Sequence, residues 1–553
     1  MVSLDLYDNT VTVSFPYSEE QVSAIKHITS DFSKRIRAWR VSPSRIEEIY
    51  HAFPDVWTSP RLQKWIELQR ELEAQKREDA PQPHWVGRAL FPHQKSAVRY
   101  LSNFEKCGLF GPPGTAKTAV AITWALRIPG PRLVVCPAAV KYHWVHEIRE
   151  CDPKAEIFIV QATSGPMVAP AQWSVINYDI LASRMKDLPE FSTLLGDETQ
   201  MISQGRPESK KDADKPPKGS KRGNAVLKLA EHTKNVLFMT GSPVLNRPVE
   251  LEPTLIALGK LSPRERFPWR IRFCQGERVL LNPMGVKYHN RAEKWAWQFK
   301  GSSNVELLSR ELSTFSVRWT LDEIGGCLPP VTHTLLEIDL PDLGPHEEMR
   351  AEMKRLLKSS DPLARGQALA MMGRMIQWTG EQKVRYVADA VQERLSAGES
   401  PVVFSDFLAP LAALRERFKG ECLMLDGTMP QEKREIVKQY FLERPGACVL
   451  LASRRATGTG LDGLQHKART CIFHTLPWNP AGFQQAYGRL ARTGQRHPVE
   501  VITTVARGTV DEAVLEIIYR KAKVTDVLCS SPSLSESAKK DWESVLGLLG
   551  GLQ

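Results

Sequence analysis

A short stretch from Gly111 to Thr118, GPPGTAKT, carries residue types that bind a nucleoside triphosphate. It follows the apolar run GLF and precedes a helical pattern, which is the strand, turn and helix order of a phosphate-binding loop. Backbone amides of such a turn face the phosphates, and the positive end of the next helix adds to them. We expect Lys117 to reach the β- and γ-phosphates of ATP and the Thr118 hydroxyl to bind Mg²⁺. The other loop residues expected at the nucleotide are Gly111, Gly114, Thr115 and Ala116.

Ala116 stands where this loop pattern usually has glycine. A methyl group fits at this position if the backbone φ is negative. We therefore interpret Ala116 as a tolerated variant and expect a negative φ. The alternatives are a chance match or an inactive loop, and the correct spacing of Lys117 and Thr118 favours a working site.

A pair of adjacent acids ends another apolar run, in LLGDETQ. Asp197 is expected to hold Mg²⁺ through water, and Glu198 to polarise the water that attacks the terminal phosphate. Adjacent acids are common on protein surfaces, so the pair alone is weak evidence. Its position at a strand end, downstream of the phosphate-binding loop, predicts a site that hydrolyses the nucleotide.

Two arginines late in the chain, Arg489 and Arg492, lie three residues apart in QQAYGRLARTGQR. On a helix this spacing puts them on one face, with Gln485 one turn earlier on the same stripe. Guanidinium groups aimed at the terminal phosphate from a second domain neutralise charge that develops in the transition state. The alternative is a solvated basic helix face. The nucleotide motifs earlier in the chain favour the first role.

The elements that must position these residues fall into two series. Short apolar runs alternate with helical patterns in GLFGPPG, RLVVCP, SVINY, STLLGDE and NVLFMTGSP, and the alternation starts again in PVVFSDF, ACVLLAS, TCIFHTLP and VEVITTV. Such runs are typical of buried strands in a parallel sheet with helices between them. We predict an α/β fold class with two parallel-sheet lobes in tandem, preceded by a small α+β module. The length of 553 residues also requires several domains.

The small module is predicted from alternation and capping signals. Val11, Val13 and Phe15 alternate with polar residues as in a strand, and Ser18 with Gln21 forms a capping pattern before a helix. A basic segment, KRIRAWR, follows. One interpretation is a phosphate-binding surface, and the other is a solvated face with the tryptophan in a small core. The first interpretation makes DNA-contacting residues of Lys34, Arg35 and Trp39.

Composition shifts predict the boundaries between parts. Ser59 as N-cap and Pro60 at the first helical position predict a connector helix. The stretch 204–223 has almost no apolar residues and is expected to be a mobile basic loop. The predicted parts are the module at 1–55, the helical connector at 56–86, a first lobe at 87–264, an irregular or helical linking region at 265–375, a second lobe at 376–530, and a flexible tail with a short helix at 531–553.

In their order along the chain, these motifs resemble those of a superfamily-two helicase motor of the Swi/Snf type. The resemblance covers about Ala89 to Leu528 and includes LFPHQKSAV, GPPGTAKT, GDETQ, MTGSPVLNRP, TGTGLDGLQ and LPWNPAGFQQAYGRLARTGQ. It implies two RecA-like lobes with ATP between them. It also implies that Gln94 recognises adenine and that Gly460 and Asp462 contribute to the nucleotide site.

The same resemblance implies DNA contacts in three segments of the first lobe, VVCPAAVKYHWVHEI, VINYDIL and MTGSPVLNRP. For the first segment, a purely structural role of its lysine and tryptophan stays open. The residues expected to contact DNA are Lys141, Trp144, Asn177, Tyr178, Thr240 and Ser242.

The chain departs from the family pattern in two places. The residues of the phosphate-binding loop around Ala116 differ from those usual in the family, and Thr199-Gln200 replaces Ala-His after the acid pair. The roles of Asp197 and Glu198 are unaffected, but the link from the acid pair to DNA or to the second lobe is expected to be tuned. The N-terminal module resembles the HARP domain of annealing helicases through Phe15, Tyr17, Ile25, Lys26 and Trp39, with a generic α+β decoration as the alternative.

The resemblance implies an ATP-dependent double-stranded DNA translocase that remodels or reanneals forks and bubbles. A formal charge of +11 favours an anionic partner. Three alternatives stay open: a motor that displaces bound proteins such as RNA polymerase or histones, a DNA-binding scaffold with weak ATPase activity, and activation by RNA. The nine cysteines show no metal spacing, and no secretion signal or membrane-spanning run is found. We expect a monomer that is cytoplasmic and nucleoid-associated, or nuclear in a eukaryote.

Overall fold

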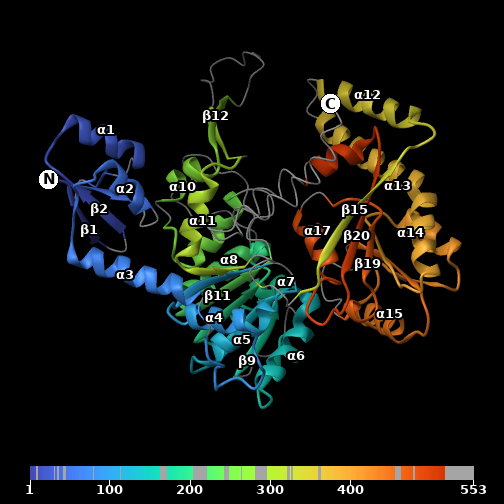
Figure 1. Ribbon diagram of the computed structural model, residues 1–553, viewed down its shortest axis with the longest axis horizontal. Helices are drawn as coiled ribbons and strands as arrows, with labels where there is room; N and C mark the ends of the chain where they lie inside the picture. The colour runs from blue at the N-terminus through green and yellow to red at the C-terminus, as the bar shows by residue number, and fades with distance from the viewer. Residues whose placement is uncertain are drawn as a thin grey trace.

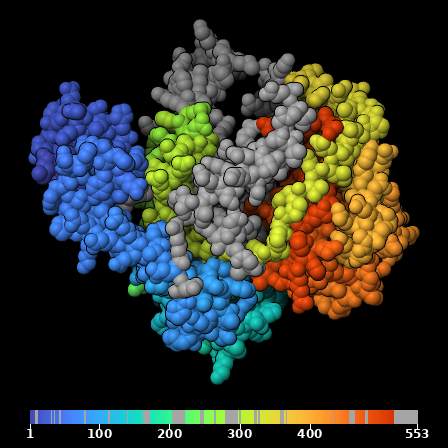
Figure 2. Space-filling view, in the orientation of Figure 1, coloured from blue at the N-terminus to red at the C-terminus, as the bar shows by residue number. Residues whose placement is uncertain are grey.

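The computed structural model describes residues 1–518, apart from 8–9, 30–31, 34–35, 42–44, 77, 79, 112–113, 162–170, 203–220, 242–247, 263–264, 281–294, 300, 320–323, 325–327, 359–362, 455–462, 478–479 and 517. Three bodies follow one another along the chain: a small sheet with two helices and two larger parallel sheets with helices around them (Figure 1). This confirms the predicted α/β class with two lobes after a small α+β module. The module and the second lobe lie on opposite sides of the first lobe in Figure 1 and Figure 2.

The N-terminal module is a five-stranded sheet in the order β3-β4-β2-β1-β5. Leu4 and Leu6 of β1 and Val11 and Val13 of β2 are buried in one core, as the alternation of strand side chains requires. The strands are β1 (Ser3–Tyr7), β2 (Thr10–Ser14), β3 (Phe32–Ser33), β4 (Ala38–Val41) and β5 (Trp57–Thr58), and the helices are α1 (Glu19–Ile28), which Ser18 caps as predicted, and α2 (Ile46–Ala52).

The module extends beyond the predicted limit at residue 55. Strand β5 pairs in parallel with β1. Ser59 caps α3 (Pro60–Gln75), as predicted, by accepting a hydrogen bond from the Leu62 amide at 3.2 Å. Leu62 belongs to the core of the module, whereas Leu72 of the same helix belongs to a core of the first lobe. Helix α3 is therefore part of both bodies rather than a free connector.

The first lobe is built on a seven-stranded sheet in the order β14-β6-β11-β10-β7-β9-β8, and all of its printed pairings are parallel. Because parallel strands end at the same edge, Phe110, Asp197 and Thr240 lie together at the carboxyl edge of three neighbouring strands. The strands are β6 (Lys106–Phe110), β7 (Arg132–Cys136), β8 (Ile157–Ile159), β9 (Trp173–Asn177), β10 (Thr193–Asp197), β11 (Asn235–Thr240) and β14 (Ser316–Arg318).

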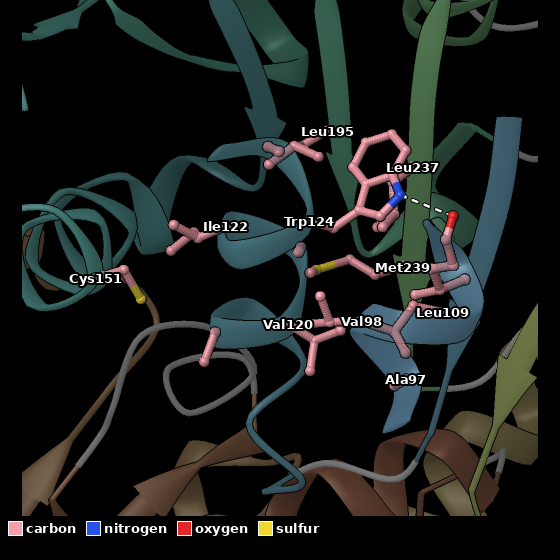
Figure 3. Close-up of a cluster of buried hydrophobic side chains, with 14 of the residues drawn as sticks. Ala97, Val98, Leu109, Val120, Ile122, Trp124, Cys151, Leu195, Leu237 and Met239 are labelled. Atoms are coloured by element: carbon pink, nitrogen blue, oxygen red, sulfur yellow. Dashed lines mark hydrogen bonds between the residues drawn. The ribbon is translucent and has the colours of Figure 1, made fainter. Parts of the chain in front are cut away.

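Helices cover both faces of this sheet, and each face has its own apolar core. On one face, Val120, Ile122 and Trp124 of α5 pack against Leu109 and Leu237 of the strands (Figure 3). The helical elements are α4 (Pro92–Leu101), α5 (Lys117–Leu126), η2 (Ala138–Val140), α6 (Lys141–Cys151), α7 (Tyr178–Arg184), η3 (Thr199–Ile202), α8 (Lys221–His232), η5 (Pro248–Leu251), α9 (Glu252–Ala257), α10 (Arg266–Phe273) and α11 (Val305–Ser313).

The predicted linking region at 265–375 is not a separate unit among the described residues. Strand β14 pairs with β6, so the first lobe continues to about residue 318. An antiparallel hairpin, β12 (Gly276–Leu280) with β13 (Trp295–Phe299), precedes β14 and projects from the first lobe in Figure 1. Strand β15 (Val331–Ile338) pairs with β20 (Val499–Ala506) of the second sheet. The sequence of this region has no clear hydrophobic periodicity, so the strands β14 and β15, which join the first and the second sheet, were not predicted.

The second lobe is a six-stranded parallel sheet in the order β15-β20-β19-β16-β18-β17. Helix α13 (Ala364–Ser396) crosses the boundary that was predicted at residue 376. The remaining strands are β16 (Val402–Ser405), β17 (Cys422–Leu425), β18 (Val449–Ser453), β19 (Thr470–Phe473) and β20 (Val499–Ala506), and the helical elements are α12 (Gly344–Lys358), α13 (Ala364–Ser396), α14 (Leu408–Arg417), α15 (Gln431–Glu443), η6 (Leu464–His466) and α17 (Pro480–Tyr487). Among the described residues, no helix has the length and apolar character needed to cross a membrane.

Candidate nucleotide site between the lobes

The phosphate-binding loop lies between β6 and α5, as predicted. The Gly111 amide donates to the Thr240 carbonyl at 3.2 Å, which ties the start of the loop to the neighbouring strand β11. The Lys117 ammonium donates to the Gly111 carbonyl at 2.7 Å, so the side chain folds back across the loop that it is expected to serve. Lys117 is also the first residue of α5, which directs the helix N-terminus at the loop.

Ala116 differs from the expectation. Its φ is +52° and its ψ is +43°, so the backbone is left-handed and the predicted negative φ is wrong. The turn needs this conformation to lead into α5, and glycine adopts it without steric cost. The Cβ of alanine crowds the following carbonyl there, at a cost of about 1 kcal/mol.

The acid pair ends β10 at the carboxyl edge of the sheet. Burial and the adjacent Glu198 raise the pKa of Asp197 to about 7, and hydrogen bonding from Trp144 and the charge of Lys117 oppose this rise. Glu198 has a φ of +51°, a left-handed conformation that is uncommon for a residue with a side chain. Strain of this kind is concentrated at functional sites. The two carboxyl groups therefore differ in both backbone and surroundings.

A relay of hydrogen bonds links Glu198 to the end of β11. Gln200 donates from Nε2 to Oε2 of Glu198 at 2.5 Å, and its Oε1 accepts from the Thr240 hydroxyl. The sequence marked Gln200 only as a departure from the family pattern and assigned it no contact. The structure makes it the bridge between the acid pair and the segment MTGSP. An amide suits this place because it donates and accepts at once.

Thr118 and Asp197 have the oxygen ligands that Mg²⁺ prefers, a hydroxyl and a carboxylate. Thr118 is the second residue of α5 and Asp197 is the last residue of β10, and both are partly exposed. Elements α5 and β10 contact each other in the first lobe. The chemistry of these donors fits a magnesium ion held between phosphates and protein.

Gln94 is almost fully buried beside the loop. Its Oε1 accepts from the Phe91 amide at 2.9 Å and its Nε2 donates to the Ala116 carbonyl at 3.4 Å. The side chain therefore contacts the phosphate-binding loop itself. Recognition of adenine by Gln94 stays a prediction.

The two arginines do not lie on a helix, in contrast to the expectation. Helix α17 ends at Tyr487, and Arg489 and Arg492 lie in the turns that follow it. After α17 the Arg489 and Leu490 amides bond to carbonyls three residues back, those of Ala486 and Tyr487, instead of four residues back as in an α-helix. Gln485 stays in α17 and is partly exposed.

This turn segment of the second lobe contacts the phosphate-binding loop of the first. The Thr493 hydroxyl donates to the Gly114 carbonyl at 3.3 Å. A Cβ atom on Gly114 would lie 2.9 Å from the Cβ of Arg492 and 3.0 Å from the Ala491 carbonyl oxygen. Arg492 is thus brought to the loop. The Thr493 contact was not predicted, because nothing in a single sequence pairs it with Gly114.

The residues expected to contact DNA in the first lobe are buried where the structure describes them. Trp144 has no exposed surface and donates from its indole to Asp197, which supports the structural alternative. Burial lowers the pKa of Lys141, whose ammonium donates to the Val160 carbonyl at 3.2 Å. The others, none more than 5% exposed, are Asn177, Tyr178 and Thr240. The packing of these helices and strands turns the described side chains inward.

The remaining predicted residues divide into two groups. Trp39 is partly buried against the module core and meets Phe32 edge-on at 5.1 Å, which favours the small-core interpretation over a phosphate-binding surface. Several positions lie outside the described residues: Gly460, Asp462, Ser242, Lys34, Arg35 and most of the predicted loop 204–223.

Comparison with known proteins first defines the class. Residues 382–494, which lie in the second lobe, match the helicase conserved C-terminal domain. A solved structure of the Sulfolobus solfataricus SWI2/SNF2 ATPase core in complex with double-stranded DNA aligns with 82% of this chain and 96% of its own, with 20% identity and a TM-score of 0.37.

The chain is also similar to two curated proteins. The chain is 24% identical over 482 residues to the DNA annealing helicase and endonuclease ZRANB3 of Mus musculus, covering 83% of this chain and 42% of the relative. It is 25% identical over 454 residues to the SWI/SNF-related matrix-associated actin-dependent regulator of chromatin subfamily A-like protein 1 of Xenopus tropicalis, covering 79% and 45%. The chain is therefore homologous to these proteins, which confirms the predicted resemblance. It spans less than half the length of either relative.

Proposed function

We propose that this chain is an ATP-dependent translocase on double-stranded DNA that remodels or reanneals forked structures. The observation that carries the proposal is the contact of the two lobes at the nucleotide loop, where Arg492 and Thr493 meet Gly114. A site completed by both lobes makes its own hydrolysis depend on how they are arranged. Closing on ATP and opening after hydrolysis then moves one lobe against the other.

The residues divide the chemistry between the lobes. Lys117 leaves the Gly111 carbonyl to bind the β- and γ-phosphates, while Glu198 orients the attacking water. Thr118 and Asp197 would hold Mg²⁺, which would supply positive charge to the phosphate oxygens. From the second lobe, Arg489 and Arg492 neutralise charge in the transition state, and Gln94 recognises the adenine base.

DNA is the proposed partner for three reasons. The relative from Mus musculus is named a DNA annealing helicase, the chain carries a charge of +11, and the first-lobe segments match those of DNA motors. Since the matched side chains that the structure describes are buried, we assign the grip to backbone amides and exposed side chains of the same helices, acting on phosphates. Affinity for DNA should therefore fall steeply with salt.

ATP turnover with and without nucleic acid tests the proposal. Wild-type protein is compared with Lys117→Ala and Glu198→Gln in the presence of duplex DNA, single-stranded DNA and RNA. We expect duplex DNA to stimulate the wild type and both variants to lose turnover by at least about 100-fold, in line with the loss of a transition-state contact. Equal phosphate release from all three proteins would eliminate the enzyme in favour of a scaffold. Stronger stimulation by RNA would replace DNA as the partner.

Deletion of the N-terminal module tests whether the protein remodels forked DNA. The cut belongs after Leu68 rather than at residue 55, because β5 and the first half of α3 share the module core while Leu72 anchors the helix to the first lobe. We expect the protein lacking residues 1–68 to keep duplex-stimulated ATPase activity and to lose fork regression. Unchanged fork activity would leave the module without this role. Displacement of a protein roadblock at a rate above fork regression would favour the protein-displacing motor.

A further inference from the structure

Trp144 is buried and bonded to Asp197, the acid proposed to hold Mg²⁺. It lies on α6, has no exposed surface, and donates from Nε1 to Oδ2 of Asp197 at 3.0 Å. Other buried tryptophans of the same lobe behave differently. Trp124 donates to the backbone carbonyl of Leu101 at 2.9 Å (Figure 3), and the indole nitrogen of Trp173 has no hydrogen-bond acceptor in the structure. Trp144 is thus bonded to a carboxylate, whereas Trp124 and Trp173 are not.

Tyr178 holds the same residue from another direction. It is the first residue of α7, is 1% exposed, and donates from its hydroxyl to the backbone carbonyl of Asp197 at 2.6 Å. A tyrosine hydroxyl carries its proton at neutral pH and can therefore donate this bond. Two helices thus fix Asp197, one through the side chain and one through the main chain.

This arrangement has a consequence for the ion. A hydrogen bond to one carboxylate oxygen sets the plane and rotation of the whole group, and so directs the other oxygen. Partners that orient a ligating group in this way commonly change metal affinity by 10- to 100-fold when they are removed. Packing alone does not require an N–H at this place, because a phenyl ring fills most of the same volume.

We propose that Trp144 and Tyr178 are positioning residues that fix Asp197 for the magnesium–nucleotide complex. The inference rests on the proposed nucleotide site and extends it by two residues that touch neither the ion nor the nucleotide. Trp144 lies in α6, which follows β7, and Tyr178 is the first residue of α7, which follows β9. Two further helices of the first lobe are therefore bonded to Asp197 at the end of β10.

A pair of matched substitutions separates this role from simple core packing. Trp144→Phe and Trp124→Phe each remove one buried indole from the same apolar core, but only the first removes a bond to Asp197. The readout is the Mg²⁺ concentration that half-saturates binding of a fluorescent, non-hydrolysable ATP analogue to the full chain. We expect about a tenfold rise for Trp144→Phe and less than about twofold for Trp124→Phe. Tyr178→Phe should raise it about threefold, since the main-chain bond acts less directly.

The outcomes distinguish this inference from the proposed function. Wild-type protein that does not bind the analogue at all would contradict the proposed nucleotide site, and binding without any dependence on Mg²⁺ would contradict the proposed metal site. Wild-type protein with normal Mg²⁺ dependence, and equal half-saturation in the two tryptophan variants, would overturn only the positioning role. If Trp144→Phe does not fold, Tyr178→Phe decides, because its ring stays in place and only the hydroxyl is lost. An unchanged value there then overturns the inference.

Discussion

Thr493 and Gly114 lie 379 positions apart in the chain, yet the hydroxyl of the first donates to the carbonyl of the second at 3.3 Å. This bond joins the arginine segment of the second lobe to the phosphate-binding loop of the first. It makes the loop sensitive to the position of the other lobe, and it places the most direct experimental test at a glycine.

Gly114→Ala should separate the lobes at the nucleotide site. The added methyl would lie 2.9 Å from the Cβ of Arg492 and meet the backbone of Ala491, at a φ of +84° that also strains alanine. We expect DNA-stimulated ATP turnover to fall by at least about 30-fold, through loss of the arginine contribution to the transition state. Steady-state ATPase assays measure this.

Gly446→Ala is the matched control. Its φ is +78°, so the backbone strain is similar, but a Cβ there meets nothing within 4 Å. Turnover should stay within about twofold of the wild type once stability is accounted for. Equal loss in both variants would mean that strain, not the contact between lobes, explains the effect.

Ala116→Gly should stabilise the first lobe. The left-handed backbone at φ +52° costs alanine about 1 kcal/mol that glycine avoids, although part of this gain is lost because glycine makes the unfolded chain more flexible. We expect a net rise of up to about 1 kcal/mol in the free energy of unfolding, measured with urea. Ala121→Gly, inside the same helix α5, should instead lower it by about 1 kcal/mol. A loss of stability in Ala116→Gly would show that the methyl group contributes packing that exceeds the strain.

Gln200→Ala should disconnect Glu198, the carboxylate proposed to orient the attacking water, from β11. The amide no longer holds Glu198 or accepts from Thr240, so the carboxylate loses its orientation. We expect kcat to fall about tenfold with little change in nucleotide affinity, as removal of a positioning contact predicts. Gln439→Ala removes a comparable amide–carboxylate bond, to Glu443 on the exposed face of α15, and should change neither value. A matching fall in affinity for Gln200→Ala would argue for a damaged loop instead.

His474 should make the second lobe acid-sensitive. Burial, with help from the charge of Lys383, lowers its pKa from 6.5 to about 3, and its ring nitrogens face the Ser405 hydroxyl and the Gly380 carbonyl. Below about pH 6.5 this histidine is therefore protonated in the unfolded chain but stays neutral in the folded lobe. Its contribution to the free energy of unfolding is fully present above that pH and falls by about 2 kcal/mol between pH 7.5 and pH 5.

Urea unfolding of wild type and His474→Gln at these two pH values measures the effect. The glutamine variant starts less stable at pH 7.5 but should lack this part of the acid loss. An identical pH slope in both proteins would assign the acid sensitivity to other groups.

Much of the site was readable from residue order. The spacing in GPPGTAKT predicted the loop between β6 and α5, and the apolar runs predicted the strands that end at Phe110, Asp197 and Thr240, whereas the roles of Lys117 and Thr118 stay predictions. Local patterns suffice here because strand alternation, helix starts and glycine-rich turns depend on neighbours in sequence. The region 265–375 lacked such a pattern, so its division between the two sheets escaped prediction.

The sequence by itself determined which motifs exist, their order, and hence the two-lobed α/β class. Only the tertiary structure decided how side chains face one another. It turned Trp144 and Tyr178 inward onto Asp197, put Ala116 and Glu198 in left-handed backbone, ended α17 before Arg489, and brought Thr493 to Gly114. The reason is that these features depend on contacts between segments far apart in the chain, and such contacts arise from the packing of whole elements rather than from any local preference.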